Sequence, residues 1–194
     1  MSESGSDRVA DTPKQHDAPP DRVDGGHAPW VAAVVTASDG VSAGDRSDRS
    51  GPAVAARLEA AGFAVLAVEV VPDERRVIAD TLRRLADQQG VAVVAITGGT
   101  GFGPRDVTPE ATLDVIDRAA PGLAEAMRAV GRQHTPMADL SRGVCGLRGS
   151  TLLLDLPGSP KGATESLEAV LGLLPHALEL LSGDTAHTPG PPPD

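Results

Sequence analysis

The chain has 194 residues, of which 40% are hydrophobic and only 2% are aromatic, with no tyrosine and a formal net charge of −10. A chain of this length suits one domain with a core of ordinary size. The scarcity of aromatic rings removes base stacking as a binding mode, and the negative charge is the opposite of the basic footprint of nucleic-acid-binding proteins. The composition therefore argues against a nucleic-acid partner, and any anionic ligand must be held by local groups.

The sequence contains no feature of a membrane or secreted protein. No apolar run approaches the roughly 20 residues that span a bilayer, and no stretch has the pattern of a signal peptide. Cys145 is the one cysteine and cannot form an intrachain disulfide, so we interpret it as a small buried hydrophobic residue. These features predict a cytoplasmic protein that does not contact membranes.

Both ends of the chain have the composition of disordered tails. Residues 1–29 mix Ser, Asp, Gly and Pro with almost no large apolar side chain, and residues 185–194 are rich in proline. Such segments cannot bury enough apolar surface to offset their ordering entropy. We therefore expect one folded domain at residues 30–184.

Within this domain, short apolar runs alternate with longer amphipathic segments. The apolar runs predict strands at residues 30–38, 63–71, 91–97 and 150–156. The amphipathic segments predict helices at residues 51–62, 74–90, 108–118, 121–133 and 161–183, the last interrupted at Pro175. Strands without polar alternation, separated by helices, indicate a mostly parallel sheet covered on both faces. The predicted fold is a three-layer α/β/α sandwich.

A glycine-rich stretch, "AITGGTGFGPRDVTPEA" at residues 95–111, joins the third strand to the next helix. Thr108 is expected to cap that helix, with Pro109 and Glu110 in its first turn. Open parallel sheets bind ligands where a strand ends and a helix N-terminus begins, and phosphate is the natural ligand there. The stretch matches neither the dinucleotide-binding pattern nor a Walker loop. A tight structural turn is the alternative interpretation.

Two aspartates are candidates for phosphate chemistry. Asp106 can ligate Mg²⁺ held jointly by substrate phosphates, while its neighbour Arg105 can bind phosphate oxygens. The alternative for this pair is a surface ion pair with a capping carboxylate. Asp73, in "VVPDERR", follows the second strand and is expected at the same edge of the sheet, with a helix N-cap as its alternative role.

Three further loops carry polar groups. The first strand ends in "TASDGVSAGDRSDRSG", which contains Ser38 and Asp39, and the fourth ends in "LDLPGSPKG", where a rigid turn can present backbone donors and an ammonium group to an anion. "LSRG" at residues 140–143 adds Arg142. Each has a plainer interpretation as an ordinary turn or a solvated charge. The five histidines are scattered and predict no zinc site.

Taken jointly, these stretches resemble the MoaB/Mog family of molybdenum-cofactor biosynthesis proteins. "TASDGVSAGDRSDRSG", "PDE", "TGGTGFGPRDVTPEA", "LSRGVCGLRGSTLLLDLPGSPKG" and "LLPHALELL" follow one another in the order and spacing of that family, and the resemblance covers nearly all of residues 30–183. It implies a domain that assembles as a trimer or a dimer of trimers. It also implies binding of molybdopterin, a pterin with a dithiolene and a terminal phosphate.

In active members, AMP is transferred from ATP to that phosphate with Mg²⁺, which releases pyrophosphate and prepares the dithiolene for molybdenum insertion by a partner protein. The resemblance assigns Asp106 to Mg²⁺ and to catalysis and Asp73 to the second catalytic acid. Its further ligand-binding positions are Ser38, Asp39, Gly98, Gly99, Thr100, Gly101, Arg105, Ser141, Arg142, Pro157, Gly158, Ser159, Pro160 and Lys161.

The short connection between "LPGSPKG" and "LLPHALELL" is similar to that of MoaB-type members, whereas many Mog-type members carry an insertion there. Three hypotheses follow. The chain is a molybdopterin adenylyltransferase, a noncatalytic molybdopterin-binding or carrier protein, or an enzyme for another nucleotide-like substrate, because fold alone does not fix function.

Overall fold

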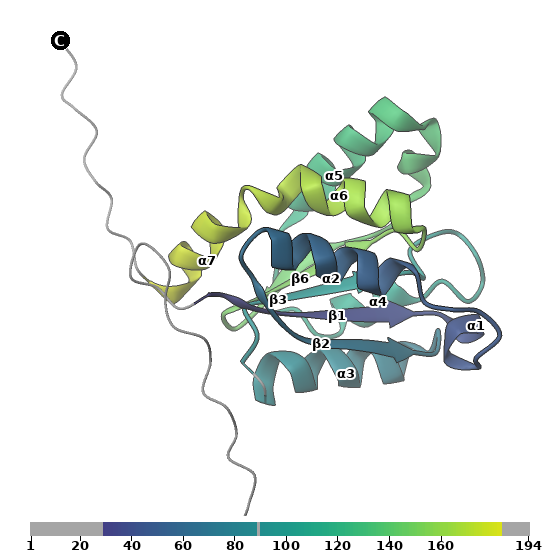
Figure 1. Ribbon diagram of the computed structural model, residues 1–194, viewed down its shortest axis with the longest axis horizontal. Coiled ribbons are helices and arrows are strands. Elements are labelled where there is room, and N and C mark those ends of the chain that lie inside the picture. Colours follow the sequence, from purple (N-terminus) through teal and green to yellow (C-terminus); the bar gives the residue numbers. More distant parts are fainter. Residues whose placement is uncertain (1–28, 89, 184–194) are drawn as a thin grey trace, which may run out of the picture.

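A six-stranded sheet forms the middle layer of the protein (Figure 1). The computed structural model describes residues 29–88 and 90–183, so the predicted tails, apart from Pro29, lie outside the described residues. The strand order across the sheet is β2-β1-β3-β6-β5-β4. In chain order the strands are β1 (Val31–Ala37), β2 (Ala64–Val71), β3 (Val93–Thr97), β4 (Arg118–Ala119), β5 (Cys145–Arg148) and β6 (Thr151–Leu156).

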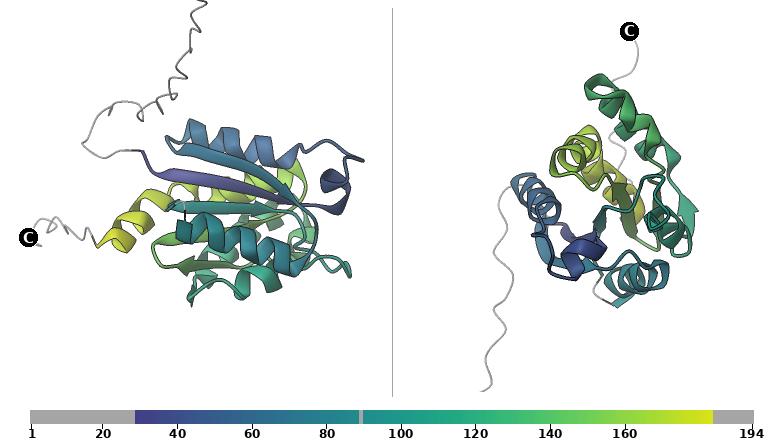
Figure 2. Two further views of the ribbon diagram at one scale, coloured as in Figure 1. Left: turned by 90° about the horizontal axis from the view of Figure 1, so that it is seen from below. Right: turned by 90° about the vertical axis from the view of Figure 1, so that its right-hand side faces the viewer.

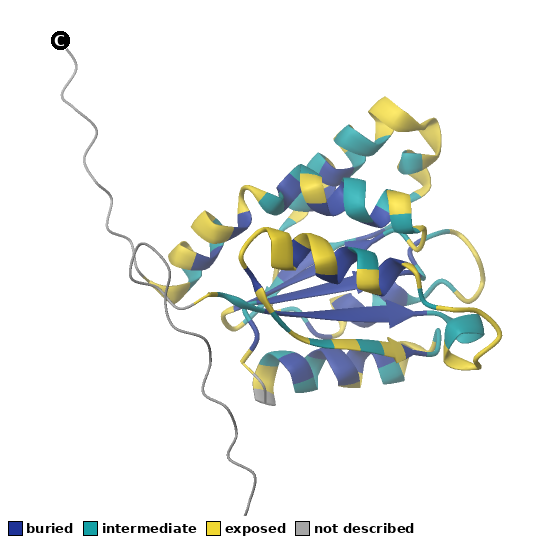
Figure 3. Ribbon diagram, in the orientation of Figure 1, coloured by how far each residue is buried: buried dark blue, intermediate teal, exposed yellow. Residues whose placement is uncertain are grey.

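The four strands predicted from apolar runs form the parallel part of the sheet. β1 pairs in parallel with β2 and β3, and β3 pairs in parallel with β6. β5 runs antiparallel to β6, and β4 antiparallel to β5. β1, β3 and β6 are buried along almost their whole length (dark blue in Figure 3), as expected for strands covered on both faces. The predicted three-layer α/β fold is confirmed.

Helices cover both faces of the sheet (Figure 2). On one face, α2 (Ser50–Ala60), α5 (Pro121–His134), α6 (Pro160–Leu171) and α7 (Leu174–Ser182) bury one hydrophobic cluster. On the other, α3 (Arg75–Gln88) and α4 (Thr108–Leu113) bury a second. The segment predicted as an amphipathic helix at residues 74–90 forms α3, and its Ile78, Leu82 and Leu85 are all fully buried.

The region after α4 differs from the prediction. The helix expected over residues 108–118 ends at Leu113, and the chain then adds the short strand β4 to the sheet edge. A side chain at Gly146 of β5 would collide with Ile116, so the glycine lets Ile116 pack across the strand. A 3₁₀ helix, η1 (Pro136–Leu140), was also not predicted. The predicted interruption at Pro175 is confirmed, because α6 ends at Leu171 and Pro175 lies in the first turn of α7.

The carboxyl ends of β1, β2, β3 and β6 lie at one edge of the sheet, because these strands are parallel. The loops that follow them hold the residues predicted to bind ligands, together with the short helix α1 (Asp39–Ser42). Cys145 is buried, as predicted for a small hydrophobic residue, and burial raises the pKa of its thiol to about 12. In residues 29–88 and 90–183, every helix is too short or too polar to span a bilayer.

Candidate active site

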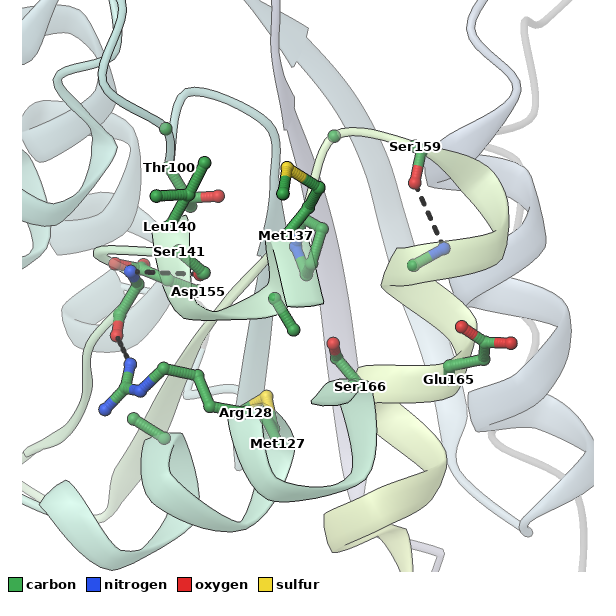
Figure 4. A pocket seen from close by; sticks show the side chains of 18 of the residues that line it. Thr100, Met127, Arg128, Met137, Leu140, Ser141, Asp155, Ser159, Glu165 and Ser166 are labelled. Carbon is green, nitrogen blue, oxygen red and sulfur yellow. Dashed lines mark hydrogen bonds between the residues drawn. The ribbon is translucent and has the colours of Figure 1, made fainter. Parts of the chain in front are cut away.

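Two neighbouring cavities open at this edge of the sheet. One, of about 420 Å³, lies among the glycine loop, α5, η1 and the start of α6, and we call it the η1 cavity (Figure 4). The other, of about 440 Å³, lies between the β1 loop, the start of α2 and the glycine loop, and we call it the α2 cavity. Gly99, Asp106 and Gly158 line both cavities. The cavities therefore meet at a neck made largely of glycine.

Main-chain contacts at the neck are too close for side chains. Gly98 and Gly99 have φ of 104° and 61°, in the region that favours glycine. A Cβ on Gly98 would collide with the carbonyl of Ala37, and one on Gly158 would lie 3.3 Å from the Gly98 Cα. The Thr97 hydroxyl donates to the Pro157 carbonyl at 2.7 Å, which ties the loop after β3 to the loop after β6. The glycines thus bring three loops together around one point.

Asp73 and Asp39 hold each other through their main chains. Asp39 N donates to Asp73 Oδ2 at 2.8 Å, and Asp73 N donates to Asp39 Oδ1 at 3.0 Å. Arg105 donates from Nε and Nη2 to the Asp39 carboxylate at 2.9 and 3.0 Å, and these hydrogen bonds lower the pKa of Asp39. Burial raises the pKa of Asp73, and the neighbouring carboxylates of Asp39 and Asp106 add to that rise. Asp73 is therefore held in place by Asp39, and its pKa lies above that of an isolated aspartate.

Two buried oxygen atoms face Gly99 without a partner. Among the described residues, Asp73 Oδ1 and Thr108 Oγ1 are the buried side-chain polar atoms that make no hydrogen bond. Both lie within 3.1 Å of the position that a Cβ on Gly99 would take. The predicted capping role of Thr108 is wrong, because Val107 is the N-cap of α4 and Thr108 already lies inside the helix. The N-cap role for Asp73 is not observed either, since its Oδ2 binds Asp39 N.

Asp106 lies at the neck, beside these atoms. Its Oδ2 accepts a hydrogen bond from Gly103 N at 2.7 Å. Asp73 and Asp106 line the α2 cavity together, so both acids lie at the same edge of the sheet, as expected. The described residues form no group of three or more His, Cys, Asp or Glu side chains that could hold a metal ion. Two carboxylates with an unpartnered oxygen still fit Mg²⁺, because Mg²⁺ usually takes one or two carboxylates and completes its shell with water and substrate phosphates.

The α2 cavity is polar and carries two cations. Asp48 accepts hydrogen bonds from Thr36 Oγ1 at 2.8 Å and from Gly51 N at 3.0 Å, which fixes the start of α2 against β1. Arg46 and Arg49 also line the cavity. The sequence interpretation did not single out these arginines, although the repeated Arg-Ser pairs in "DRSDRS" were a visible signal. This cavity can therefore accept an anionic ligand.

The η1 cavity has an apolar wall with a buried acid. Met127 of α5 and Met137 of η1 contribute apolar surface, and Arg128 donates to the Gly143 carbonyl at 3.0 Å (Figure 4). Asp155 of β6 is 3% exposed and accepts hydrogen bonds from Thr112 Oγ1 at 2.7 Å and Val144 N at 3.1 Å. Burial raises the pKa of Asp155 to about 7. The acid was not predicted as a site residue, although a lone carboxylate in "TLLLDL" is a recognisable signal.

The structure places most predicted site residues on these cavities and a few outside them. Those lining one or both cavities are Ser38, Asp73, Gly98, Gly99, Thr100, Gly101, Asp106, Ser141, Pro157, Gly158, Ser159 and Pro160. Those lining neither cavity are Asp39, Arg105, Arg142 and Lys161. Arg105 forms the ion pair that was its alternative interpretation, here with Asp39. The Lys161 side chain is 81% exposed and its Nζ lies 3.8 Å from Glu165.

Comparison with known proteins identifies the family. The model of a family described as a probable molybdopterin binding domain matches residues 33–176. A molybdopterin adenylyltransferase of Haemophilus influenzae is 42% identical over 164 residues, covering 77% of this chain and 83% of that protein. The molybdenum cofactor synthesis protein cinnamon of Drosophila melanogaster is 41% identical over 155 residues, which cover 79% of this chain but only 26% of that longer protein.

Solved structures agree with this assignment. The crystal structure of the molybdopterin biosynthesis enzyme MoaB from Thermus thermophilus has a TM-score of 0.76 and 53% sequence identity, covering 79% of this chain and 97% of that one. The residues matched by the family model include nearly all of the four parallel strands and every loop that contributes to the two cavities. The chain belongs to the MoaB/Mog family of molybdopterin-binding domains.

Proposed function

We propose that the protein is a molybdopterin adenylyltransferase, which transfers AMP from ATP to the terminal phosphate of molybdopterin in molybdenum-cofactor biosynthesis. The observation that carries the proposal is the position of Asp73 and Asp106 on one cavity, next to a second cavity that shares Asp106. The relatives named molybdopterin adenylyltransferase, at about 40% identity over most of the chain, support the reaction class.

The two cavities suit two different substrates. The α2 cavity, with Arg46 and Arg49 and the N-terminus of the 11-residue helix α2, fits the anionic phosphates of ATP. The η1 cavity, with its methionines and buried acid, fits a flat heterocycle that has apolar faces and polar edges. In this arrangement the terminal phosphate of molybdopterin reaches the neck from one side and the ATP phosphates reach it from the other.

The main contribution of the protein to catalysis is then to align the molybdopterin phosphate with the α-phosphate of ATP. An oxygen of the molybdopterin phosphate bonds to the α-phosphorus of ATP, and the bond from that phosphorus to the β-phosphate oxygen breaks to release pyrophosphate. Asp106, with Asp73 Oδ1 as the second acid, would hold Mg²⁺, and the bound ion would supply positive charge to the phosphates. The glycine neck lets both phosphates approach within bonding distance, and the walls hold them in line.

The test is a turnover assay with molybdopterin, ATP and Mg²⁺ that follows adenylylated product and pyrophosphate. Asp106→Asn and Asp73→Asn are each expected to lower kcat by about a hundredfold or more, because either change removes a negative oxygen from the phosphate site. Asp80→Asn is the matched control, because Asp80 pairs with Arg83 on the surface of α3 and lines neither cavity. Absence of product with the unaltered protein would contradict the proposal, as would full activity of both site variants.

A noncatalytic molybdopterin-binding role is the second candidate. The observation in its favour is the short connection from "LPGSPKG" to "LLPHALELL", residues 163–172, nearly all of which lies in α6. The same assay separates the two functions. A binding protein retains molybdopterin without forming pyrophosphate, whereas an enzyme loses turnover in Asp106→Asn while the pterin still binds.

We further propose that the chain assembles as a trimer or hexamer and that its product passes to a molybdenum-insertion protein. The edge strand β2 leaves Leu66, Val68 and Val70 exposed on one face, and aliphatic side chains are the expected anchors of an interface in a protein poor in aromatic residues. Light scattering coupled to size-exclusion chromatography measures the mass, and a monomer at micromolar concentration would contradict the assembly.

A further inference from the structure

The Arg142 guanidinium is occupied by contacts with the glycine loop. Its Nε donates to the Gly101 carbonyl at 2.6 Å, and its Nη2 donates to the Asp106 carbonyl at 2.5 Å. Its Nη1 donates to the Glu110 carboxylate, and the Arg142 main-chain N donates to the Thr100 carbonyl at 2.9 Å. One side chain therefore joins both ends of the loop at 101–106 to the first turn of α4.

These contacts change the role expected for this residue. The sequence resemblance implied that Arg142 binds the substrate, but all three guanidinium nitrogens donate to protein oxygens and Arg142 lines neither cavity. The fork of a guanidinium has donors in fixed directions, so it can satisfy several carbonyl oxygens at once. The hydrogen bonds of the Arg142 guanidinium therefore stabilise the main chain of the glycine loop, and we call this set of contacts the Arg142 brace.

We propose that Arg142 is a positioning residue, which acts by fixing the Asp106 main chain so that the Asp106 carboxylate points into the neck between the cavities. The inference rests on the proposed function, in which that carboxylate holds Mg²⁺ at the phosphates. It gives Arg142 no contact with either substrate.

The contacts around Asp106 explain why a brace is needed. Gly98, Gly99, Gly101 and Gly103 give the loop more conformational freedom than other residues would, and this freedom must be lost to place the carboxylate. Arg142 holds Asp106 through its carbonyl, while Gly103 N binds the carboxylate Oδ2 at 2.7 Å on the other side. The residue is thereby fixed at both its main chain and its side chain.

The Glu110 carboxylate keeps the brace in place. Its hydrogen bond from Arg142 lowers the pKa of Glu110, so the carboxylate stays ionised at neutral pH. Glu110 lies in the first turn of α4, directly after the loop, so the ion pair connects a rigid element to the segment after η1. The charged pair therefore orients the guanidinium toward the two carbonyls.

The experiment compares steady-state kinetics of the unaltered protein with those of Arg142→Lys. Lysine keeps the charge but loses the fork, so it cannot bind Gly101, Asp106 and Glu110 together. We expect kcat to fall by about tenfold to a hundredfold, as misplacement of a reacting group does, with the KM for molybdopterin changed by less than about twofold. We also expect the Mg²⁺ concentration for half-maximal rate to rise. A raised KM for molybdopterin with kcat intact would show that Arg142 binds substrate and would overturn the proposal.

Arg75→Lys is the matched control. Arg75 donates from Nε and Nη2 to Asp114 near the other end of α4, each at 2.6 Å, and it lines neither cavity. Loss of this fork changes a similar ion pair near the same helix, so kinetics within about twofold of the unaltered protein are expected.

Arg142→Ala should regain part of its lost kcat when guanidinium ion is added at millimolar concentration, whereas a general folding defect would not recover.

Hydrogen exchange measures the same brace without turnover. The main-chain amides of residues 99–107 are expected to exchange faster in Arg142→Lys than in the unaltered protein, with α3 unchanged, and Mn²⁺ is expected to bind more weakly in the presence of an unreactive ATP analogue. Unchanged exchange in this loop would overturn the inference. If the unaltered protein fails to turn over, the proposed function fails, while exchange and Mn²⁺ binding still decide whether Arg142 orders the loop.

Discussion

Asp39 and Asp73 each donate a main-chain N–H to the carboxylate of the other, at 2.8 and 3.0 Å. The pair joins the loops that follow β1 and β2, and it leaves Asp73 Oδ1 as the atom of that carboxylate without a protein partner. Asp39 thus determines which oxygen of Asp73 is available to a ligand, although Asp39 itself lines neither cavity.

Asp39→Ala is expected to lower kcat by about tenfold, because it removes the acceptor for Asp73 N and lets the catalytic acid shift. Asp39→Asn keeps an acceptor for Asp73 N and should lose less. Arg105→Ala separates the two effects, since it removes the ion pair and leaves the reciprocal hydrogen bonds in place. If Arg105→Ala alone lowers kcat as much as Asp39→Ala does, Asp39 acts through its ion pair with Arg105. That result would contradict a role of Asp39 in positioning Asp73. Steady-state kinetics of the three variants provide the measurement.

Gly99→Ala should lower activity by at least about tenfold, because its Cβ would occupy the space between Asp73 Oδ1 and Thr108 Oγ1. Gly44→Ala is the control for backbone strain. Gly44 also has positive φ, at 82°, but a Cβ there meets no heavy atom within 4 Å. Both variants should lose about 1 kcal/mol of unfolding free energy from backbone strain, and Gly99→Ala should lose more because its Cβ would collide with Thr108 Oγ1. Only Gly99→Ala should lose turnover. Equal activities would show that the space at Gly99 is not used by a ligand.

Thr108→Val is expected to stabilise the protein while lowering its activity. Valine has nearly the same shape and removes a buried hydroxyl that has no hydrogen-bond partner, which is worth about 1 kcal/mol of unfolding free energy and a rise of roughly 2 to 4 °C in Tm. The activity falls because the hydroxyl faces the same point as Asp73 Oδ1. Thr112→Val is the control, since Thr112 Oγ1 donates to Asp155 at 2.7 Å and its loss should destabilise the protein. A lowered Tm for Thr108→Val would contradict the expectation.

Asp155 should make stability depend on pH in the neutral range. Its folded pKa of about 7 lies above the value of 3.8 for an unperturbed aspartate, so the folded state binds the proton more tightly. This stabilisation is fully present below pH 3.8 and is lost as the pH rises through 7. We expect the unfolding free energy to decrease between about pH 5 and pH 8, by on the order of 2 kcal/mol.

Groups whose pKa is lowered contribute little to the pH dependence of the unfolding free energy between about pH 5 and pH 8. Hydrogen bonds from arginines lower the pKa values of four carboxylates, those of Asp39, Asp87, Glu110 and Asp114. The stabilisation that these carboxylates add to the folded state is therefore lost only below about pH 4. Asp73 has a raised pKa and adds to the same trend as Asp155. Denaturant unfolding at several pH values should therefore show a smaller slope for Asp155→Asn. An unchanged slope would assign the dependence to another group.

The sequence predicts the parallel half of the sheet well, for a physical reason. β1, β3 and β6 are buried on both faces, so nearly every side chain in them is apolar and each strand is visible as a continuous run. Once those strands are parallel, the residues that follow them meet at one edge. The parallel order of the strands therefore places Asp73 and Asp106 at one cavity, although 33 positions separate them in the chain.

Other features depend on contacts that no local pattern contains. β4 has two residues, both exposed, and it exists because β5 offers a pairing edge and Gly146 leaves room for Ile116. Thr108 was predicted to cap α4, since its residue type suits that role, but the helix begins one position earlier and buries the hydroxyl. The resemblance implied that Arg142 binds the substrate, but the sequence does not show that its guanidinium donates to three protein oxygens.

The described chain begins before β1 and ends after α7 at the amino-terminal side of the parallel strands (Figure 1). Both cavities are lined by residues of the loops at the carboxyl side of these strands. β1 begins and α7 ends away from the neck, at the side of the sheet opposite the loops that line the cavities. The points at which the chain enters and leaves the described domain are therefore separate from the cavities. The match to the Drosophila relative, which covers only 26% of that longer protein, is consistent with this arrangement.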